Sequence, residues 1–300
     1  MELRQLRYFL AVAEQRHFGR AADHLRIAQS GLSQQIKSLE RSVGTQLFVR
    51  DRRRVELTPA GEYLVEEARA LLARASRVEE TLPVIDKGKG GLLKVATSSA
   101  GLHPLAGDLV DRFRERFPDV ELHVVPGSGP QNLEALQRRE VDVVFVSVPF
   151  DQLDGLTLLP TGTLELVIAL SERHRLASNE RIARQELLTE PFLTWPRTFD
   201  PPLMDHIHRS LFGDLEHPSL IEMPDLTQTT RLTRLARSDR LIGLGLPAEA
   251  ELMVPGLAYR RVEHPVPVVD YGLAWLNEHD SPFAAGFIDT VREALRADQG

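Results

Sequence analysis

The stretch from Ala21 to Glu40, AADHLRIAQSGLSQQIKSLE, constrains the fold of this chain more than any other. Apolar side chains recur at helical spacing on both sides of a short polar corner, which predicts two amphipathic helices joined by a tight turn. The apolar positions are Phe18, Ala21, Ala22 and Leu25 in the first helix and Leu32, Ile36, Leu39 and Val43 in the second. Two short helices in this order are typical of a helix-turn-helix.

The second of these helices carries a polar face between its apolar positions. That face consists of Gln29, Ser30, Ser33, Gln34, Lys37 and Arg41. Amides, hydroxyls and cations are the groups that contact base edges and phosphates in the major groove of DNA. The alternative is a solvated helix face, and this stretch alone does not decide between the two.

The charge of the chain is unevenly distributed. The net charge is −7, which by itself argues against a nucleic-acid partner. Residues 1–58, however, contain 11 Lys and Arg against 6 Asp and Glu, a net charge of +5, and the remainder carries −12. A basic head on an acidic body is expected when one domain meets phosphates and the other does not.

A basic loop follows the predicted helix-turn-helix. The apolar segments Gln46–Val49 and Val55–Thr58 flank the sequence RDRRR, which predicts a two-stranded wing with a positively charged tip. We expect Arg52, Arg53 and Arg54 to contact phosphates or the minor groove. A solvated loop tip is the alternative.

A long helix is predicted after the wing, because Thr58 and Pro59 form a favoured N-cap and first position. Its apolar positions alternate between spacings of four and three, a repeat that prefers a partner helix. These positions are Leu64, Ala68, Leu71, Ala75, Val78 and Leu82. Pairing between two copies of the chain is favoured over packing on the same chain. Pro83 and the glycines of 88–91 are predicted to end the helix and mark a flexible boundary.

From Leu92 the pattern changes to alternating apolar strands and amphipathic helices, which predicts an α/β fold with parallel sheets. The predicted strands are 92–97, 120–125, 141–148, 164–170, 192–195, 219–223, 241–246 and 266–276, and the predicted helices are 102–117, 131–139, 182–187, 202–212, 226–237 and 283–295. The predicted domains are a winged helix-turn-helix (1–58), a linker helix (59–87) and an α/β domain (88–300). We expect two lobes, 92–162 with 267–300 and 163–266, to enclose a cleft.

Hydroxyl side chains follow three of these strands. Thr97, Ser98 and Ser99 end the first, Ser128 follows the second, and Ser147 lies at the end of the third. The carboxyl ends of parallel strands share one edge of a sheet, so these side chains can converge on a ligand. A helix N-terminus also favours anions, so we expect a small carboxylate or another anion. The alternative is that these residues only cap helices.

Several chemistries find no support in the sequence. The chain has no cysteine and no apolar run of about 20 residues, and its first helix is charged, which predicts a cytoplasmic protein. His206 and His208 are spaced to point apart on a helix, and Asp142 lacks a second acid or a histidine. We therefore predict no metal, no cofactor and no catalytic residue. The alternatives are an α/β enzyme with a helical dimerisation domain and a solute-binding protein.

Five ordered motifs in residues 1–65 resemble the LysR-type bacterial transcriptional regulators: LRYFLAVAE, FGRAAxxL, AQSGLSQQIKSLE, GxQLFxR and LTPAG. Weaker matches at 139–142, 174–176 and 243–247 extend the resemblance over the chain. It implies a winged helix-turn-helix, a dimerising linker helix and an effector domain resembling periplasmic solute-binding proteins. It also implies promoter DNA and a small-molecule effector as partners, a homodimer or homotetramer, and contact with RNA polymerase.

The resemblance assigns DNA contact to particular residues of this chain. These are Gln29, Ser30, Ser33, Gln34 and Lys37 on the recognition helix and Arg52, Arg53 and Arg54 on the wing. The chain departs from the family where Gly31 replaces a frequent Ala, Gln34 a frequent Arg, and His17 a common Ser or Thr. The last departure predicts a weaker start of the second helix.

Overall fold

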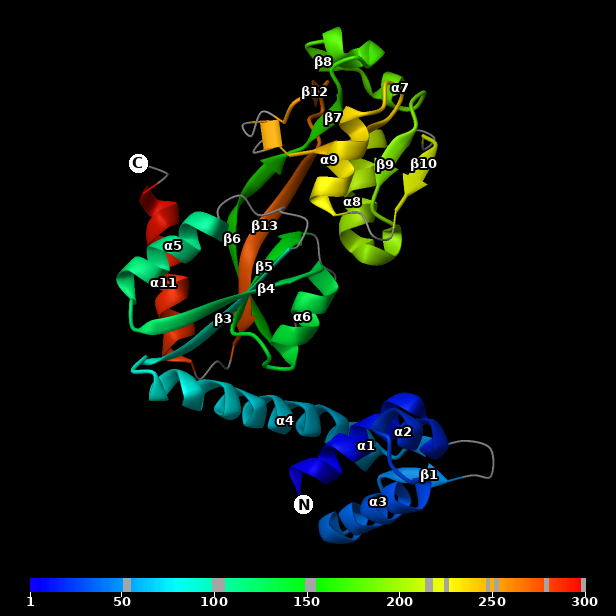
Figure 1. Cartoon of the computed structure of the whole chain (residues 1–300), viewed down its shortest axis with the longest axis vertical. Helices are drawn as coiled ribbons and strands as arrows, with labels where there is room; N and C mark the ends of the chain where they lie inside the picture. Colours follow the sequence, from blue (N-terminus) through cyan, green and yellow to red (C-terminus); the bar gives the residue numbers. More distant parts are fainter. Residues whose placement is uncertain are drawn as a thin grey trace. The chain divides into compact units, whose positions relative to one another are not determined.

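The structure is a computed structural model that describes residues 1–50, 55–98, 106–148, 155–213, 218–223, 227–246, 249–250, 254–277 and 281–297. The chain divides into two compact units (Figure 1). One comprises Met1–Gly88 with Arg138–Glu140, and the other comprises Lys89–Gln137 with Val141–Gly300. No helix of the described residues is long and apolar enough to cross a membrane.

The predicted helix-turn-helix is present in the first unit. Helices α1 (Leu3–Gln15), α2 (Phe18–Leu25) and α3 (Gln29–Val43) surround a core in which Phe9, Leu32 and Ile36 are completely buried. Gly44 ends α3 in the left-handed conformation, with φ of 77°.

The start of α2 differs from the prediction. His17 is an effective N-cap, because its Nδ1 accepts hydrogen bonds from the backbone N–H groups of Gly19 and Arg20, at 3.0 and 3.2 Å. An imidazole nitrogen therefore supplies the acceptor that a Ser or Thr hydroxyl would supply at this position.

The wing begins with a contact between α3 and the backbone that follows it. Strands β1 (Phe48–Arg50) and β2 (Val55–Leu57) pair antiparallel, as predicted. The Glu40 carboxylate accepts hydrogen bonds from the N–H groups of Leu47 and Phe48, at 3.1 and 3.4 Å. These two bonds fix the entry of the wing relative to α3.

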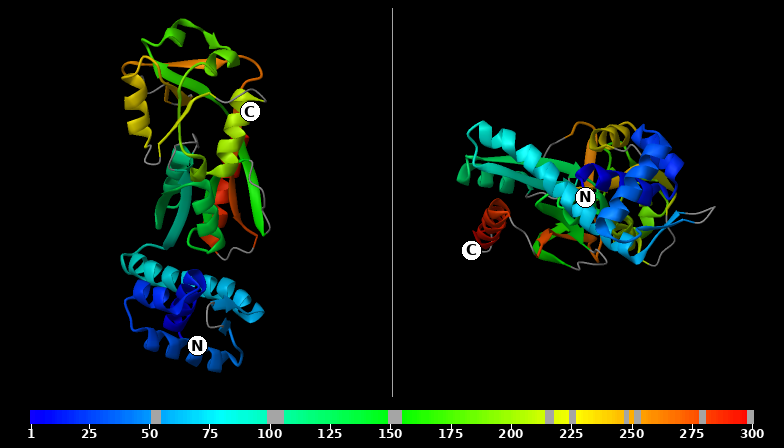
Figure 2. Two further views of the ribbon diagram at one scale, coloured as in Figure 1. Left: turned by 90° about the vertical axis from the view of Figure 1, so that its right-hand side faces the viewer. Right: turned by 90° about the horizontal axis from the view of Figure 1, so that it is seen from below.

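Helix α4 (Pro59–Asp86) is one continuous helix, drawn in cyan in Figure 2. Thr58 caps it by accepting a hydrogen bond from the Gly61 N–H at 3.0 Å, which confirms the predicted start. The prediction that Pro83 ends the helix is wrong, because the helix continues for three residues beyond it. Proline removes one backbone donor, but the carbonyl of Pro83 still accepts from the Lys87 N–H and Val84 is buried, and both interactions favour the additional turn.

The close packing of α4 against the wing gives a test of this unit. A Cβ at Gly61 would overlap the carbonyl oxygen of Leu47, whereas a Cβ at Gly31 would meet nothing within 4 Å. We expect Gly61→Ala to destabilise the first unit by about 1–3 kcal/mol. Gly31→Ala should instead stabilise it by up to about 1 kcal/mol, through higher helix propensity. Hydrogen exchange of the α1–α4 amides in the full chain measures both, and equal protection in the two variants would contradict the expected overlap.

The second unit contains two sheets, and we call each sheet with its helices a lobe. The sheet of lobe I has the order β4-β3-β5-β13-β6. Its strands are β3 (Gly91–Ser98), β4 (Val120–Gly127), β5 (Val143–Val148), β6 (Leu156–Glu165) and β13 (Val268–Leu276). The first three are parallel, as predicted, but β13 runs antiparallel to β5 and β6. The chain returns from lobe II directly at the carboxyl edge of the sheet, so its last strand must run in the opposite direction.

Helices cover both faces of this sheet (Figure 1). On one face lie α5 (Ala106–Arg116) and α11 (Pro282–Ala297), whose Phe113 and Phe287 rings meet edge to face at 5.4 Å. The opposite face is covered by α6 (Gly129–Gln137), whose Leu136 packs in a second buried cluster.

Lobe II has a mixed sheet of order β10-β9-β11-β7-β12-β8. Its strands are β7 (Val167–Ser171), β8 (Arg181–Ile182), β9 (Phe192–Thr194), β10 (Leu220–Glu222), β11 (Ile242–Gly245) and β12 (Leu257–Val262), and its helices include α7 (Arg184–Leu187), α8 (Pro201–Phe212) and α9 (Gln228–Ala236). Sequence analysis missed β6 and β12. Pro160 and Gly162 interrupt the apolar pattern of β6, and Arg260 and Arg261 interrupt that of β12.

Candidate functional site

The exposed face of α3 is polar except at its last residue, Val43, which is 38% exposed. Leu32, Ile36 and Leu39 are completely buried beneath it. Of the side chains predicted to contact DNA, Gln29, Ser30, Gln34 and Lys37 are exposed and Ser33 is half-buried. Arg41 is also exposed, and its Nε donates to the Lys37 carbonyl oxygen at 3.3 Å. Arg52, Arg53 and Arg54 lie outside the described residues.

The predicted seam of α4 divides into two parts. Ala68 is completely buried in the core of its own unit, and Leu64 is partly buried against that core. Farther along, Leu71, Val78 and Leu82 are 41%, 54% and 60% exposed, and Ala75 is half-buried. The second half of the seam is therefore the part available to a partner helix.

The strand ends of lobe I bring the predicted effector residues to one edge. Thr97 and Ser98 of β3 are in register with Pro126 and Gly127 of β4, next to Ser128. Ser147 of β5 pairs with Tyr271 of β13. Asn132 of α6 donates its Nδ2 to the Thr97 carbonyl oxygen at 3.0 Å and joins the ends of β3 and α6. The Ser98 side chain and Ser99 lie outside the described part of the structure.

Ser128 is 5% exposed and already caps α6. Its Oγ accepts from the Gln131 N–H at 3.4 Å, and its own N–H donates to the Gln131 Oε1 at 3.0 Å. The Ser128 hydroxyl therefore caps α6, which was the alternative to ligand binding. A ligand would have to share that oxygen.

Asp200 lies beside this edge, and sequence analysis did not single it out. It begins α8 in lobe II, where its Oδ1 accepts from the Leu203 N–H at 3.2 Å. Its carboxylate also accepts from the Gly129 N–H of lobe I, and burial raises the pKa of this carboxyl above its ordinary value. An Asp followed by two prolines is a helix N-cap signature, so the helix start could be predicted, but the contact with the other lobe could not.

A buried ion pair lies next to Trp195 in lobe II. Arg231 is 1% exposed and pairs with Glu249, while its guanidinium lies 5.2 Å from the centroid of the Trp195 ring. Burial lowers the pKa of Arg231 and raises that of Tyr259 to about 12, where nearby Glu249 adds to the increase. Sequence analysis placed Arg231 in a helix and Trp195 in a strand, and it gave no role to Glu249 or Tyr259.

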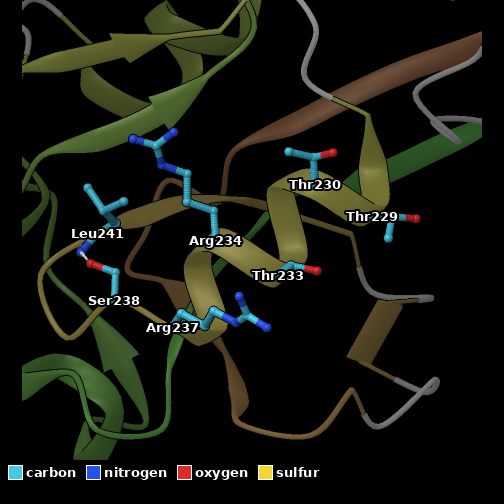
Figure 3. A pocket seen from close by; sticks show the side chains of 7 residues that line it. All are labelled: Thr229, Thr230, Thr233, Arg234, Arg237, Ser238 and Leu241. Carbon is cyan, nitrogen blue, oxygen red and sulfur yellow. Dashed lines mark hydrogen bonds between the residues drawn. The ribbon is translucent and has the colours of Figure 1, made fainter.

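A surface hollow of about 660 Å³ lies along α9 (Figure 3). It is lined by Thr229, Thr230, Thr233, Arg234, Arg237, Ser238 and Leu241. All seven belong to lobe II, and none of the predicted site residues is among them.

The described residues offer no group of three or more His, Asp or Glu side chains that could hold a metal ion. His206 has another role, because its Nε2 lies 2.8 Å from the Val268 carbonyl oxygen. Asp142 likewise bonds the backbone, through its Oδ2 and the Lys94 N–H at 2.8 Å.

Comparison with known proteins identifies the family of this chain. Residues 3–62 match the bacterial regulatory helix-turn-helix proteins of the lysR family, and residues 86–296 match the LysR substrate binding domain. The chain belongs to the LysR family of transcriptional regulators. The chain is 32% identical to the transcriptional regulator XapR of Escherichia coli over 268 residues, which cover 89% of each protein. It is 38% identical to BudR of Raoultella terrigena over 209 residues, 69% of this chain and 72% of that protein.

Solved structures of the LysR family share the fold. The regulator CbnR matches 98% of this chain and 99% of its own length, with a TM-score of 0.66 and 22% identity. Full-length BenM matches 100% and 98%, with a TM-score of 0.59 and 25% identity. As a LysR regulator, the chain is a transcriptional regulator with a helix-turn-helix DNA-binding domain and an effector-binding domain.

The buried ion pair gives a test of lobe II. Arg231→Met would leave the Glu249 carboxylate buried without its guanidinium, and we expect a loss of stability of about 3–5 kcal/mol. Urea unfolding measures this loss through the fluorescence of Trp195, in a chain where Trp275 is replaced by Phe. Adding Glu249→Leu should recover most of the stability. A double variant as unstable as the single one would show that the pair is not the cause.

Proposed function

We propose that α3 of this regulator lies in the major groove and reads promoter DNA with Gln29, Ser30, Ser33, Gln34 and Lys37. The observation that supports this is the exposed polar face above completely buried Leu32, Ile36 and Leu39. Amides suit adenine edges, hydroxyls are versatile donors and acceptors, and a cation suits guanine or phosphate. The structure of CbnR in complex with its target DNA, at a TM-score of 0.63, supports the same use of the fold.

Arg52, Arg53 and Arg54 of the wing supply phosphate or minor-groove contacts in this proposal. Their charges account for three of the 11 cations in residues 1–58. Phosphate contacts release counterions, so this part of the binding energy weakens with salt.

Point variants separate base reading from phosphate contact. Gln34→Ala should reduce discrimination between selected and scrambled DNA by about 1–3 kcal/mol. Lys37→Ala should weaken binding to both DNAs and lower the salt slope by about 1, and replacing the three wing arginines by Ala should lower the slope further. Fluorescence anisotropy at several salt concentrations, on duplexes selected by the wild-type chain, measures each effect. The matched control is Arg112→Ala, which removes an exposed cation from α5, and an equal effect there would refute the assignment.

The effector is proposed to bind at the carboxyl edge of lobe I, through Thr97, Ser98, Ser99, Ser128 and Ser147. The register of β3, β4 and β5 supports this, because it brings three strand ends together. A carboxylate or another anion is the ligand class that the hydroxyl run after β3 favours. The proposed domain limits are 1–58, 59–87 and 88–300, with lobe I formed by 92–162 and 267–300 and lobe II by 163–266.

The linker helix is proposed to pair two copies of the chain. The exposed side chains of Leu71, Val78 and Leu82 support this. A homodimer would present two recognition helices to two half-sites, so the promoter site should have approximate two-fold symmetry. We also propose that dimers assemble into a homotetramer, that the regulator contacts RNA polymerase and that it is cytoplasmic.

Two substitutions on α4 test this interface. Val78→Glu places a charge on the exposed seam, where two copies would bring like charges together at a cost of several kcal/mol. We expect sedimentation velocity to show a smaller species than the wild-type chain at micromolar concentration. Tyr63→Glu is the matched control, since Tyr63 is 70% exposed but lies off the seam. Unchanged sedimentation of the Val78→Glu variant would rule out pairing through this seam.

A further inference from the structure

We propose that Asp200 determines the chemical class of the effector: the part of the ligand that faces it is a hydrogen-bond donor, either an ammonium or a hydroxyl. A ligand that presents only a carboxylate at this position is rejected. The inference rests on the proposed effector site at the carboxyl edge of lobe I, and it adds a residue from lobe II.

Asp200 lies where the two lobes touch. Its carboxylate accepts one hydrogen bond from Leu203 of its own helix and one from Gly129 at the start of α6 in lobe I. The contact is so close that a Cβ at Gly129 would overlap the Asp200 Oδ2. Gly129 directly follows Ser128, so the carboxylate lies beside a proposed effector residue. Asp200 is 7% exposed, so this charge is largely removed from water.

No described Lys or Arg neutralises the charge of Asp200. The cation closest in sequence is Arg197, which is instead held by Asp205, with its Nε 2.5 Å from Oδ1. A buried carboxylate without a cation is costly, and a donor group on a ligand would offset that cost.

The N-terminus of α6 leaves no unused donor for an anion. The N–H of Ser128 bonds Gln131, that of Gly129 bonds Asp200, and that of Gln131 bonds the Ser128 hydroxyl. Pro130 has no N–H. An anion that reached this helix end would therefore meet a carboxylate in place of free N–H groups.

The other described charge at this edge is also acidic. Asp270 of β13 accepts from the Thr163 hydroxyl at 2.5 Å, while Thr97 and Ser147 contribute neutral groups at the strand ends. An anionic part of the effector is therefore expected away from both carboxylates, toward the end of β3 at Thr97. A ligand that satisfies both ends carries a carboxylate at one end and an ammonium or hydroxyl at the other, as in amino acids and hydroxy acids.

The cap of α8 does not require a buried carboxylate. An N-cap needs only the bond to the Leu203 N–H, and Asn or Ser would serve without a buried charge. A carboxylate offers about four acceptor sites, and the described residues use two of them. The remaining acceptor capacity is what a donor group on the effector would use.

The test uses the full chain and three series of matched probes. Each series keeps a carboxylate and adds a donor: propionate, lactate and alanine; succinate, malate and aspartate; 3-phenylpropionate, phenyllactate and phenylalanine. Calorimetry compares wild type with Asp200→Asn, which keeps one acceptor oxygen for the cap of α8 but removes the charge. Gly129→Ala displaces the carboxylate without removing it, and Gly107→Ala, which adds its Cβ in open space, is the matched control.

We expect a donor-bearing probe to bind the wild-type chain better than its parent carboxylate and to bind the Asp200→Asn chain about 10- to 100-fold more weakly. Gly129→Ala should weaken the same probe, and Gly107→Ala should not. The inference is overturned if only parent carboxylates bind, if no donor-bearing probe binds, or if Asp200→Asn leaves donor-bearing probes unaffected.

Ser128→Ala distinguishes failure of the inference from failure of the proposed site. Weaker binding in Ser128→Ala with unchanged binding in Asp200→Asn overturns the role of Asp200 alone. The reverse result supports Asp200 and overturns the hydroxyl site in its present form.

Discussion

The antiparallel pairing of β13 with β5 and β6 is the constraint on which the effector domain depends. It returns the last strand to lobe I, so two chain segments connect the lobes and meet where Leu166 donates to the Pro267 carbonyl oxygen at 2.8 Å. It also brings Ser147 opposite Tyr271 at the edge where β3 and β4 end. Because α8 bonds the same strand through His206 and Val268, the position of Asp200 is tied to the sheet that carries the hydroxyls.

The DNA-binding unit depends on shorter-range interactions. Helix α3 carries its buried and exposed residues on opposite faces, so the spacing of Leu32, Ile36 and Leu39 determines where Gln34 and Lys37 point. Glu40 then joins this helix to the wing through two backbone hydrogen bonds. Each of these contacts spans fewer than about ten residues, which is why this unit could be derived from local periodicity and caps.

The effector domain was predictable only in part, for physical reasons. The apolar runs of β3, β4 and β5 predicted strands with a shared carboxyl edge, but β6 was hidden by Pro160 and Gly162. The direction of β13 depends on a return from lobe II over more than 100 residues, which no local pattern encodes. The predicted hydroxyls lie at strand ends whose positions follow from parallel pairing, whereas the contact between Asp200 and Gly129 joins two lobes and leaves no periodic trace. The pairing of Arg231 with Glu249 lies within lobe II, but it joins side chains 18 residues apart and has no periodic pattern either.

The buried ion pair is connected to Asp200 through two aromatic side chains. Trp195 lies between them: the Arg231 guanidinium is over its ring, and the Phe199 ring is stacked with it at a centroid distance of 6.4 Å and an interplanar angle of 27°. Phe199 directly precedes Asp200, so the guanidinium supports the segment that places the carboxylate against lobe I. A buried ion pair contributes little net stability compared with well-packed apolar side chains, because desolvation offsets its attraction. Its directional hydrogen bonds to Glu249 and Leu244 can nevertheless hold a ring in one position. The pair therefore acts mainly on the geometry of the site. We expect a substitution of Arg231 to change the position of Asp200 through the rings of Trp195 and Phe199.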